Sequence, residues 1–285
     1  MEKVICVLVL YNPDYNITNQ AINAIIPQID TLFISDNSTI SVFDKLPKVD
    51  NIVYQKMAGN VGIAAAQNVG IKYGINNGYK YLFFLDQDSV CPNDIITTLI
   101  SEYTKLKGHG YKVGAIGPRA INRSTGKLYK GLINVGNLIN DNITQVTELI
   151  SSASFIELET FANVGYMDTS LFIDGVDHEW CWRASCIANY NFFISEKVLL
   201  SHQLGEGDRY FLWRKVAIPT PFRTYYQYRN YFILLRRPYV PNYWKLTNGI
   251  KYLIKLFYFP IFISPRIKYL KNICKGISDG ILYKR

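Results

Sequence analysis

Apolar residues in the first 118 positions of the chain follow two alternating patterns. Continuous runs rich in β-branched and aromatic residues predict buried strands, and stretches with apolar residues three or four positions apart predict helices between them. The predicted strands cover residues 3–10, 31–35, 51–55, 81–85 and 113–116, and the predicted helices cover 15–28, 63–73 and a stretch that starts at Pro92. Strands that alternate with helices form a parallel sheet, so we predict a Rossmann-like α/β fold.

The pattern changes twice beyond residue 119. Short β-type runs between turn-forming segments predict an antiparallel insertion over about 120–158, followed by helices over 161–165 and 179–188 and strands over 192–195 and 198–200. After Pro219 the periodicity is helical, near 222–237, 242–258 and 266–277. We therefore predict an α/β domain over 1–208, divided into halves 1–118 and 119–208, and a helical extension over 209–285.

Charge and aromatic residues concentrate in the extension. Residues 1–208 contain 15 Lys and Arg against 21 Asp and Glu, a net charge of −6, whereas residues 209–285 contain 16 against 1, a net charge of +15. The extension also holds 19 of the 41 aromatic residues. A basic, aromatic segment predicts an anionic partner, either a nucleic acid or a membrane surface. Its longest apolar run, 256–263, is interrupted by Pro260 and is far shorter than the roughly 20 residues of a spanning helix.

The cysteines and the N-terminus indicate where the protein works. Five scattered cysteines without a Cys-x-x-Cys pair predict a reducing compartment. The N-terminal apolar run has the character of a strand and lacks the small-residue cleavage site of a signal peptide. We therefore expect a cytoplasmic protein, which would lie peripherally on the inner face of the plasma membrane where the anionic partner of the extension is a membrane surface.

Polar residues follow three of the predicted strands. They are Tyr11 and Asn12 after the first strand, Asp36 after the second, and Asp86, Gln87 and Asp88 after the fourth. The carboxyl ends of parallel strands share one edge of the sheet, where such folds bind their ligands. Two carboxylates there suit Mg²⁺ or Mn²⁺ bound to the phosphates of a nucleotide.

The usual phosphate-binding loops are missing from the sequence. The first strand is not followed by Gly-x-Gly-x-x-Gly, and Gly-x-x-x-x-Gly-Lys-Ser/Thr does not occur, which disfavours a dinucleotide dehydrogenase and a P-loop NTPase. A sugar nucleotidyltransferase would need a glycine- and arginine-rich loop after the first strand, and residues 11–14 do not provide one.

A second group of acids lies in segment 174–183. Helix capping needs one acid, and this segment has three, so one of its carboxylates is a candidate general base. Glu179 and Arg183 have the i,i+4 spacing of a helix ion pair. His202 ends a predicted strand; most single histidines are structural, but this position suits a third metal ligand.

Eight segments together resemble a known family. They are residues 11–14, 36–38, 60–70, 86–89, 151–154, 171–183, 202–205 and 223–230. In this order they resemble the inverting nucleotide-sugar glycosyltransferases of family two, which have the GT-A fold, and among these the bacterial rhamnosyltransferase group. The resemblance implies a nucleotide-binding half over 1–118, an acceptor-side half over 119–208, and a membrane-associating extension.

The resemblance also implies roles for the residues of the donor site. Tyr11, Asn12 and Asp36 would line the nucleoside pocket, and Asn60 would lie near the donor. Asp88 would bind the metal directly, and Asp86 would lie nearer the ribose and diphosphate, with Gln87 between them in the donor site. His202 would complete the metal site.

For the acceptor side, the resemblance makes Asp177 the catalytic base, because Arg183 follows it at the spacing of the family. Ser152 and Trp180 would face the acceptor. Arg229 and Asn230 would lie near the diphosphate or the acceptor.

The implied reaction is inverting and metal-dependent transfer of a sugar, with dTDP-rhamnose as the expected donor. The acceptor would be a hydroxyl of a glycan or of a polyprenyl-diphosphate-linked glycan in the synthesis of a bacterial surface polysaccharide, such as capsule or O-antigen. A UDP-hexose donor is the alternative within the same mechanism. A non-catalytic module that binds nucleic acid or membrane would account for the extension but would leave the acidic rim unexplained. We therefore expect an anionic membrane surface as partner and no nucleic acid. The alternative is that the extension contacts a second copy of the chain.

Overall fold

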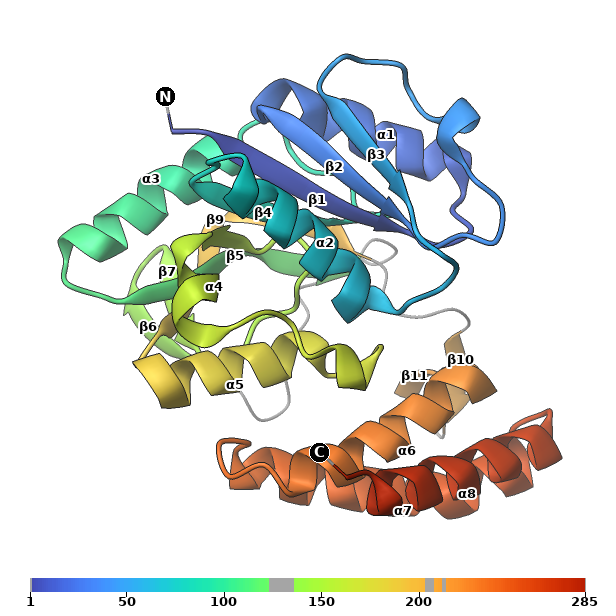
Figure 1. Cartoon of the computed structure of the whole chain (residues 1–285). Helices are drawn as coiled ribbons and strands as arrows, with labels where there is room; N and C mark the ends of the chain where they lie inside the picture. The colour runs from blue at the N-terminus through green and yellow to red at the C-terminus, as the bar shows by residue number, and fades with distance from the viewer. Residues whose placement is uncertain (1, 123–135, 203–207, 212–213, 285) are drawn as a thin grey trace.

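The computed structural model describes residues 2–122, 136–202, 208–211 and 214–284. Within them, a nine-stranded sheet has the order β3-β2-β1-β4-β8-β5-β9-β7-β6 (Figure 1). Its strands are β1 (Val4–Leu10), β2 (Thr31–Asp36), β3 (Ile52–Lys56), β4 (Tyr81–Asp86), β5 (Val113–Asn122), β6 (Asn137–Asn140), β7 (Ile143–Val146), β8 (Phe155–Glu157) and β9 (Asn191–His202).

Strand direction divides the sheet into two parallel groups. β1, β2, β3 and β4 are parallel to one another, and β5 is parallel to β9. β8 is inserted antiparallel between β4 and β5, and β7 pairs antiparallel with β9. The predicted α/β fold with a mostly parallel sheet and an antiparallel insertion is confirmed; residues 123–135 of the insertion lie outside the described residues.

Helices cover both faces of the sheet (Figure 1). Helices α1 (Tyr15–Ile25) and α3 (Ile95–Gly108) lie on one face, and α2 (Ile63–Asn76), α4 (Glu159–Val164) and α5 (Val176–Ala188) lie on the other. Continuous apolar strands are expected where both faces are covered, because alternate residues then enter opposite cores.

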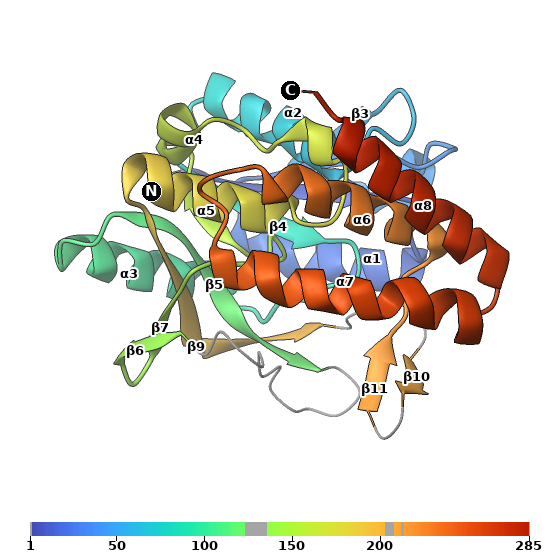
Figure 2. The same ribbon diagram turned by 90° about the horizontal axis from the view of Figure 1, so that it is seen from below.

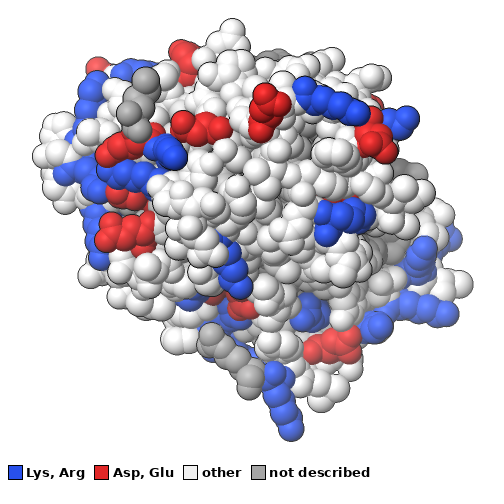
Figure 3. Space-filling model, turned by 45° about the horizontal axis from the view of Figure 1, so that its top comes forward, with Lys and Arg blue, Asp and Glu red and all other residues white. Residues whose placement is uncertain are grey.

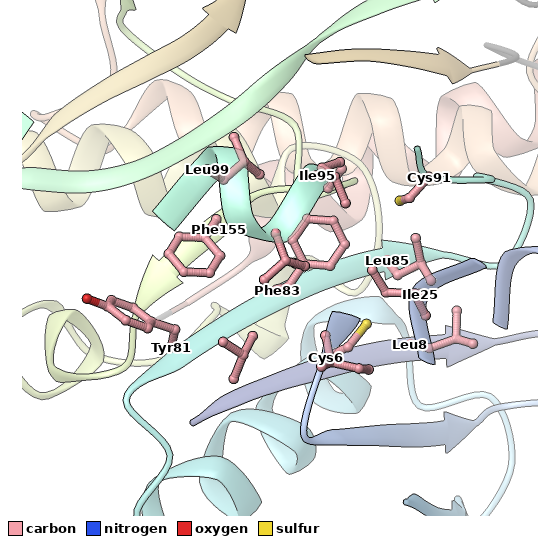
Figure 4. Packing of buried hydrophobic residues seen from close by; sticks show 14 of the residues in the cluster. Cys6, Leu8, Ile25, Tyr81, Phe83, Leu85, Cys91, Ile95, Leu99 and Phe155 are labelled. Atoms are coloured by element: carbon pink, nitrogen blue, oxygen red, sulfur yellow. The ribbon is translucent and has the colours of Figure 1, made fainter. Parts of the chain in front are cut away.

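The close-up of one core shows this alternation (Figure 4). Tyr81, Phe83 and Leu85 of β4 point toward α3, where Ile95 and Leu99 meet them. The intervening residues of β4, Leu82 and Phe84, belong to the opposite core. β4 is thereby fixed from both sides, and so is the position at which it ends.

The extension forms a layer of three helices beneath the body (Figures 1 and 2). They are α6 (Pro221–Leu235), α7 (Asn242–Phe262) and α8 (Arg266–Leu282). Ile233 and Leu234 of α6 pack in the same core as α5, while Tyr228 packs with residues of α7 and α8. Helix α6 therefore joins the other two helices to the body. No described helix is both long enough and apolar enough to cross a membrane.

Four details of the predicted elements differ from the structure. The extension begins with a β-hairpin of β10 (Asp208–Phe211) and β11 (Arg214–Ala217), and the two strands predicted after α5 form the single strand β9. Helix α5 starts at Val176 instead of Glu179, because Gly175 takes a left-handed conformation at its N-cap. Helix α7 passes through Pro260 to end at Phe262; the proline removes only its own N–H from the hydrogen bonds of the helix, and two helical residues follow it.

Candidate active site

The ends of three parallel strands bring the predicted donor residues together. In the sheet register, Asp36 pairs with Leu10 and Asp86 pairs with Val9, so both aspartates flank the end of β1. The rim predicted from the sequence therefore exists: the segments after β1, β2 and β4 emerge side by side.

Hydrogen bonds connect these segments. The backbone N–H of Tyr11 donates to Gln87 Oε1 at 2.8 Å, which ties the end of β1 to the end of β4. The N–H of Asn12 donates to Ser38 Oγ at 2.8 Å, which ties β1 to the segment after β2. Asn12 has a φ of 44°, a left-handed conformation that asparagine tolerates better than most residues. Tyr11 is exposed beside this turn, in a position that can face a ligand.

Asp36 is buried and holds its own loop. Its carboxylate accepts hydrogen bonds from the N–H groups of Ser38 (2.8 Å) and Val42 (3.3 Å) and from the Tyr54 hydroxyl (2.5 Å). Burial alone would raise the pKa of Asp36, but the hydrogen bonds from Ser38, Tyr54 and Val42 outweigh it and lower the pKa. An ionised carboxylate is thus maintained at the rim.

Asp86 and Asp88 are half-buried at the end of β4, two residues apart on a turn. Carboxylate oxygens at such a position are the donor set that Mg²⁺ and Mn²⁺ prefer, so these residues fit a divalent cation. His202 is the last residue of β9, where its backbone pairs with Asn122, and its side chain lies outside the described part of the structure. In the described ranges, no three His, Cys, Asp or Glu side chains are clustered as a ready metal site.

A four-residue loop, 151–154, connects the β4 rim with α5. Ser152 is buried with its Oγ 3.3 Å from Ser89 Oγ, just after Asp88, and the N–H of Ser151 donates to Asp177 Oδ2 at 3.2 Å. Ala153 adopts a left-handed φ of 57° and donates its N–H to the carbonyl of Phe84. Asp177 therefore stands across one short loop from the pair of aspartates, in the first turn of α5.

The segment before Asp177 is held in an uncommon backbone conformation. Phe172 and Asp174 have φ values of 63° and 64°, and left-handed residues other than glycine cost about 1–3 kcal/mol each. Asn230 of α6 stabilises the segment from behind: its amide donates to the carbonyls of Leu171 (2.8 Å), Ile173 (2.7 Å) and Asp174 (3.0 Å). Arg229 adds a hydrogen bond from Nη2 to the carbonyl of Ser170 at 2.6 Å. We expected Arg229 and Asn230 near the diphosphate or the acceptor; in this structure both donate to backbone carbonyls of the segment before Asp177.

A buried ion network supports helix α5, in which Asp177 lies. Glu179 accepts from Arg183 Nε at 2.9 Å, as the i,i+4 spacing predicts, and also from Arg237 Nη1 at 2.8 Å and the Tyr239 hydroxyl at 2.5 Å. Arg237 also pairs with Asp168. The opposing charges of Glu179 and Asp168 raise the pKa of Arg237 in spite of its burial. Arg183 further donates to backbone carbonyls, so its contacts in this structure are internal.

Trp180 is a correction to the sequence interpretation. We expected it to face the acceptor, but its side chain is 1% exposed, packs against Phe161 and Phe192, and donates Nε1–H to the carbonyl of Gly165 at 3.0 Å. Its position on the inner face of α5 accounts for this burial.

Asn60 lies at the start of α2 and is exposed. Its Oδ1 accepts from the N–H of Gly62 at 3.1 Å. Gly62 has a φ of 84°, and a Cβ atom there would approach Phe172 to 2.6 Å. The glycine thus lets the start of α2 contact the segment before Asp177, and Ile63 N–H completes the contact by donating to the carbonyl of Phe172 at 2.8 Å.

Comparison with known proteins agrees with this geometry. The chain matches no family model. It is 31% identical over 292 residues to the dTDP-rhamnosyl transferase RfbF of Shigella flexneri, a match that covers 98% of this chain and 96% of that protein. It is 24% identical over 197 residues to a low-salt glycan biosynthesis hexosyltransferase of Haloferax volcanii, covering 65% of this chain and 62% of that protein.

Two solved structures share the fold. TarS of S. aureus, crystallised with UDP-GlcNAc, superposes with a TM-score of 0.55 at 14% identity, over 97% of this chain and 81% of that one. GalNAc-T7, crystallised with UDP, GalNAc and Mn²⁺, superposes with a TM-score of 0.57 at 13% identity, over 93% of this chain and 58% of that one.

The fold is the GT-A fold of these two structures. The chain belongs to the nucleotide-sugar glycosyltransferases of family two, together with the bacterial rhamnosyltransferases. It is a sugar transferase of polysaccharide biosynthesis.

Proposed function

We propose that this enzyme transfers a sugar with inversion of configuration, with Asp177 as the general base. The observation that supports this role most directly is the loop 151–154, which contacts both the carboxylate of Asp177 and Ser89, the residue after Asp88. Asp177 takes the proton of the acceptor hydroxyl while that oxygen forms a bond to the anomeric carbon. The bond from that carbon to the nucleoside diphosphate breaks on the opposite face, and the anomeric configuration inverts.

Asp86 and Asp88 would hold a divalent cation next to the diphosphate, with His202 as a third candidate ligand. When bound, the cation neutralises negative charge that develops on the diphosphate leaving group. Tyr11, Asn12 and Asp36 are proposed to line the nucleoside pocket, with Asn60 and Gln87 beside the donor.

We propose dTDP-rhamnose as donor, supported by the match to a dTDP-rhamnosyl transferase over nearly the whole chain. Saturating dTDP-rhamnose with Mn²⁺ is expected to raise the melting temperature by about 5 °C, as ligand at 100 times its Kd stabilises by about 2.7 kcal/mol. The Asp88→Asn variant should lose the Mn²⁺-dependent part of the shift. Asp94, exposed and without a capping hydrogen bond, provides the control: Asp94→Asn should retain the full shift. A larger shift with a UDP-hexose would overturn the choice of donor.

The extension is proposed to attach the enzyme to an anionic membrane surface. Six apolar residues of α7 form one exposed stripe, each between 54% and 66% exposed; this α7 stripe consists of Leu246, Ile250, Leu253, Ile254, Phe257 and Ile261. At about 100° per residue the six positions fall within a sector of about 100°, so they lie on one side of the helix. The surrounding segment carries a net charge of +15, which complements anionic lipid headgroups.

One face of the body differs from the extension in its charges. Acidic and basic side chains are interspersed there (Figure 3). This mixture agrees with a body of net charge −6 and favours lipid contact through the extension over nucleic-acid binding through the body.

Sedimentation with vesicles tests the attachment. The full chain should sediment with vesicles that contain phosphatidylglycerol, and the double variant Leu253→Glu, Phe257→Glu should bind about tenfold less, because it introduces charge into the apolar contact. Ile187 of α5 is 60% exposed outside the extension, so Ile187→Glu is the matched control and should bind normally. If the double variant binds vesicles normally but changes from dimer to monomer in ultracentrifugation, the stripe contacts a second copy instead.

A further inference from the structure

A small cavity lies between α3, β9 and the hairpin of β6 and β7, and we call it the α3 cavity. Its volume is about 210 Å³. Three of its lining side chains are buried and form its floor: Glu102 and Leu106 of α3 and Ile143 of β7. Pockets that take drug-sized ligands span roughly 300–1,000 Å³, so this cavity suits a ligand no larger than a single sugar ring.

Glu102 is the polar member of this floor, and its carboxylate is not satisfied. The residue is 4% exposed, yet neither carboxylate oxygen accepts a hydrogen bond from any described residue. The ammonium group of Lys197 lies 3.3 Å from Oε1, as an ion pair without the geometry of a hydrogen bond. Buried polar atoms are nearly always hydrogen-bonded, because an unsatisfied one costs free energy. A ligand that supplies hydrogen-bond donors would satisfy Glu102.

The entrance of the α3 cavity is polar and is held in place by backbone contacts. Five exposed side chains surround it: Lys105, His109, Asn140, Asn142 and Lys197. Asn140 Oδ1 accepts a hydrogen bond from the N–H of Asn142 at 2.9 Å, which fixes the turn between β6 and β7. The carbonyl of Asn142 accepts from the N–H of Glu196 at 2.8 Å, which ties this turn to β9. The cavity is therefore formed without a ligand.

The charges around the cavity select the kind of ligand. A cation would meet the ammonium groups of Lys105 and Lys197, and an anion would meet the carboxylate of Glu102 on the floor. A hydroxyl group is neutral, donates to a carboxylate and accepts from an ammonium or amide group, so it suits both the floor and the entrance. Leu106 and Ile143 offer apolar contact to the C–H groups of a ring. Several hydroxyl groups on one ring with C–H groups between them are the chemistry of a sugar.

The α3 cavity is distant from the polar rim at the ends of β1, β2 and β4. Strand β7 is four places from β4 in the sheet, and strands about 4.8 Å apart put about 19 Å between the two. In Figure 1, α3 and the β6–β7 hairpin lie on the left, whereas β1 and β2 end on the right. A ligand in the cavity would therefore be separate from the proposed donor.

We propose that the α3 cavity is a second carbohydrate site, which binds one neutral pyranose unit of a glycan through hydroxyl groups that donate to Glu102. The site is additional to those of the donor and the reacting hydroxyl, and it requires neither Asp177 as base nor dTDP-rhamnose as donor. In a sugar transferase of polysaccharide biosynthesis, such a site would hold a glycan chain at a unit away from its reacting end.

Titration of the full chain, followed by methyl NMR, tests the site. The methyl groups of Leu106 and Ile143 report on the floor of the cavity, and those of Leu10 report on the end of β1. Methyl α-L-rhamnopyranoside, a neutral pyranoside, should shift the Leu106 and Ile143 signals in a saturable way. Absence of such a shift, or a shift of Leu10 alone, would overturn the proposal.

Two substitutions of acids test the contact with Glu102. Glu102→Gln keeps the size of the side chain but removes the charge and one acceptor oxygen, so it should bind the pyranoside at least tenfold more weakly. Asp94→Asn removes the same charge at the N-cap of α3, outside the cavity, and should change the affinity less than twofold. Equal affinity of Glu102→Gln and the unmodified chain would contradict the role of Glu102.

Three further ligands test the chemistry of the cavity. Tetrahydropyran has the same ring without hydroxyl groups and should not shift the Leu106 and Ile143 signals; a shift as large as that with the pyranoside would show apolar filling alone. Manganese chloride should not broaden these two signals selectively, and selective broadening would make the cavity a metal site instead. dTDP with Mn²⁺ should shift Leu10 and leave the floor signals unchanged, whereas a shift of the floor signals would overturn the separation of the two sites.

Discussion

Replacing Asp177 with asparagine is expected to reduce sugar transfer by about 10³-fold, within the range that general-base catalysis contributes. The amide keeps the size of the side chain, and its oxygen can still accept the hydrogen bond from Ser151, so loop 151–154 should keep its place. The amide cannot take a proton from the acceptor. Transfer of labelled rhamnose from dTDP-rhamnose to lipid-extractable acceptor in bacterial membranes measures the rate, and titration measures dTDP affinity.

The same measurement on Glu159→Gln provides the control. Glu159 is an exposed acid in the first turn of α4, just as Asp177 is an acid in the first turn of α5, so it tests the loss of such a charge without loss of the base. Transfer by Glu159→Gln should change less than twofold. Loss of dTDP affinity in Asp177→Asn, with transfer still measurable, would contradict the assignment of Asp177 as base.

Replacing Arg237 with methionine is expected to destabilise the fold by about 3–5 kcal/mol, the usual cost of removing one partner of a buried ion pair. Arg237 is buried between Asp168 and Glu179, and methionine fills much of its volume but leaves two carboxylates without their shared cation. Glu179 keeps Arg183 and Tyr239, so Asp168 loses more. The midpoint of urea unfolding measures the change.

A control and a pH series sharpen this prediction. Lys268→Met removes an exposed charge from α8 and should change stability by less than about 0.5 kcal/mol. Despite burial, which raises it, the pKa of Asp168 is lowered by hydrogen bonds from Ser170 and by Arg237. A carboxyl group whose pKa is lowered in the folded state stabilises the fold at pH values above its pKa in the unfolded state, and this stabilisation is lost as the pH falls. The difference in stability between Arg237→Met and the unmodified chain should therefore shrink below about pH 4. A constant difference down to pH 2 would show that the ion pair with Asp168 is not its source.

The sequence predicts the polar rim at the ends of β1, β2 and β4 well, for a physical reason. Strands buried on both faces are continuous apolar runs, so their ends are visible as the first polar residues. Asp36 and Asp86 are such residues, and parallel pairing with β1 then brings them together without further information. The same logic places Asp177 near a helix start, although the helix begins three residues earlier than predicted.

The supporting residues could not be predicted in this way. Asn230 bonds to backbone carbonyls more than 50 residues away, and carbonyls leave no mark in the sequence. Arg237 finds Asp168 and Glu179 only because α6 packs against α5. Trp180 follows an acidic stretch, and its burial depends on which side of α5 packs against the sheet. The neighbouring acids gave no indication of that side in the sequence.

These contacts change how the extension should be tested. Helix α6 supplies Asn230 and Arg237 to the body as well as the base for α7 and α8. A chain ending near Pro219 would lose the supports of the segment before Asp177 along with the membrane contact. Point substitutions in the α7 stripe separate the two effects, and truncation does not.

The reversed strand β8 determines which loop faces the aspartates. Because β8 runs against β4 and β5, the loop that faces the aspartates is the one that enters β8, at the end of the segment 120–154. The parallel register that aligns Asp36 and Asp86 is formed by β1, β2 and β4 and does not include this loop. The strand ends that carry Asp36 and Asp86 and the loop that contacts the residue after Asp88 are therefore separate stretches of the chain.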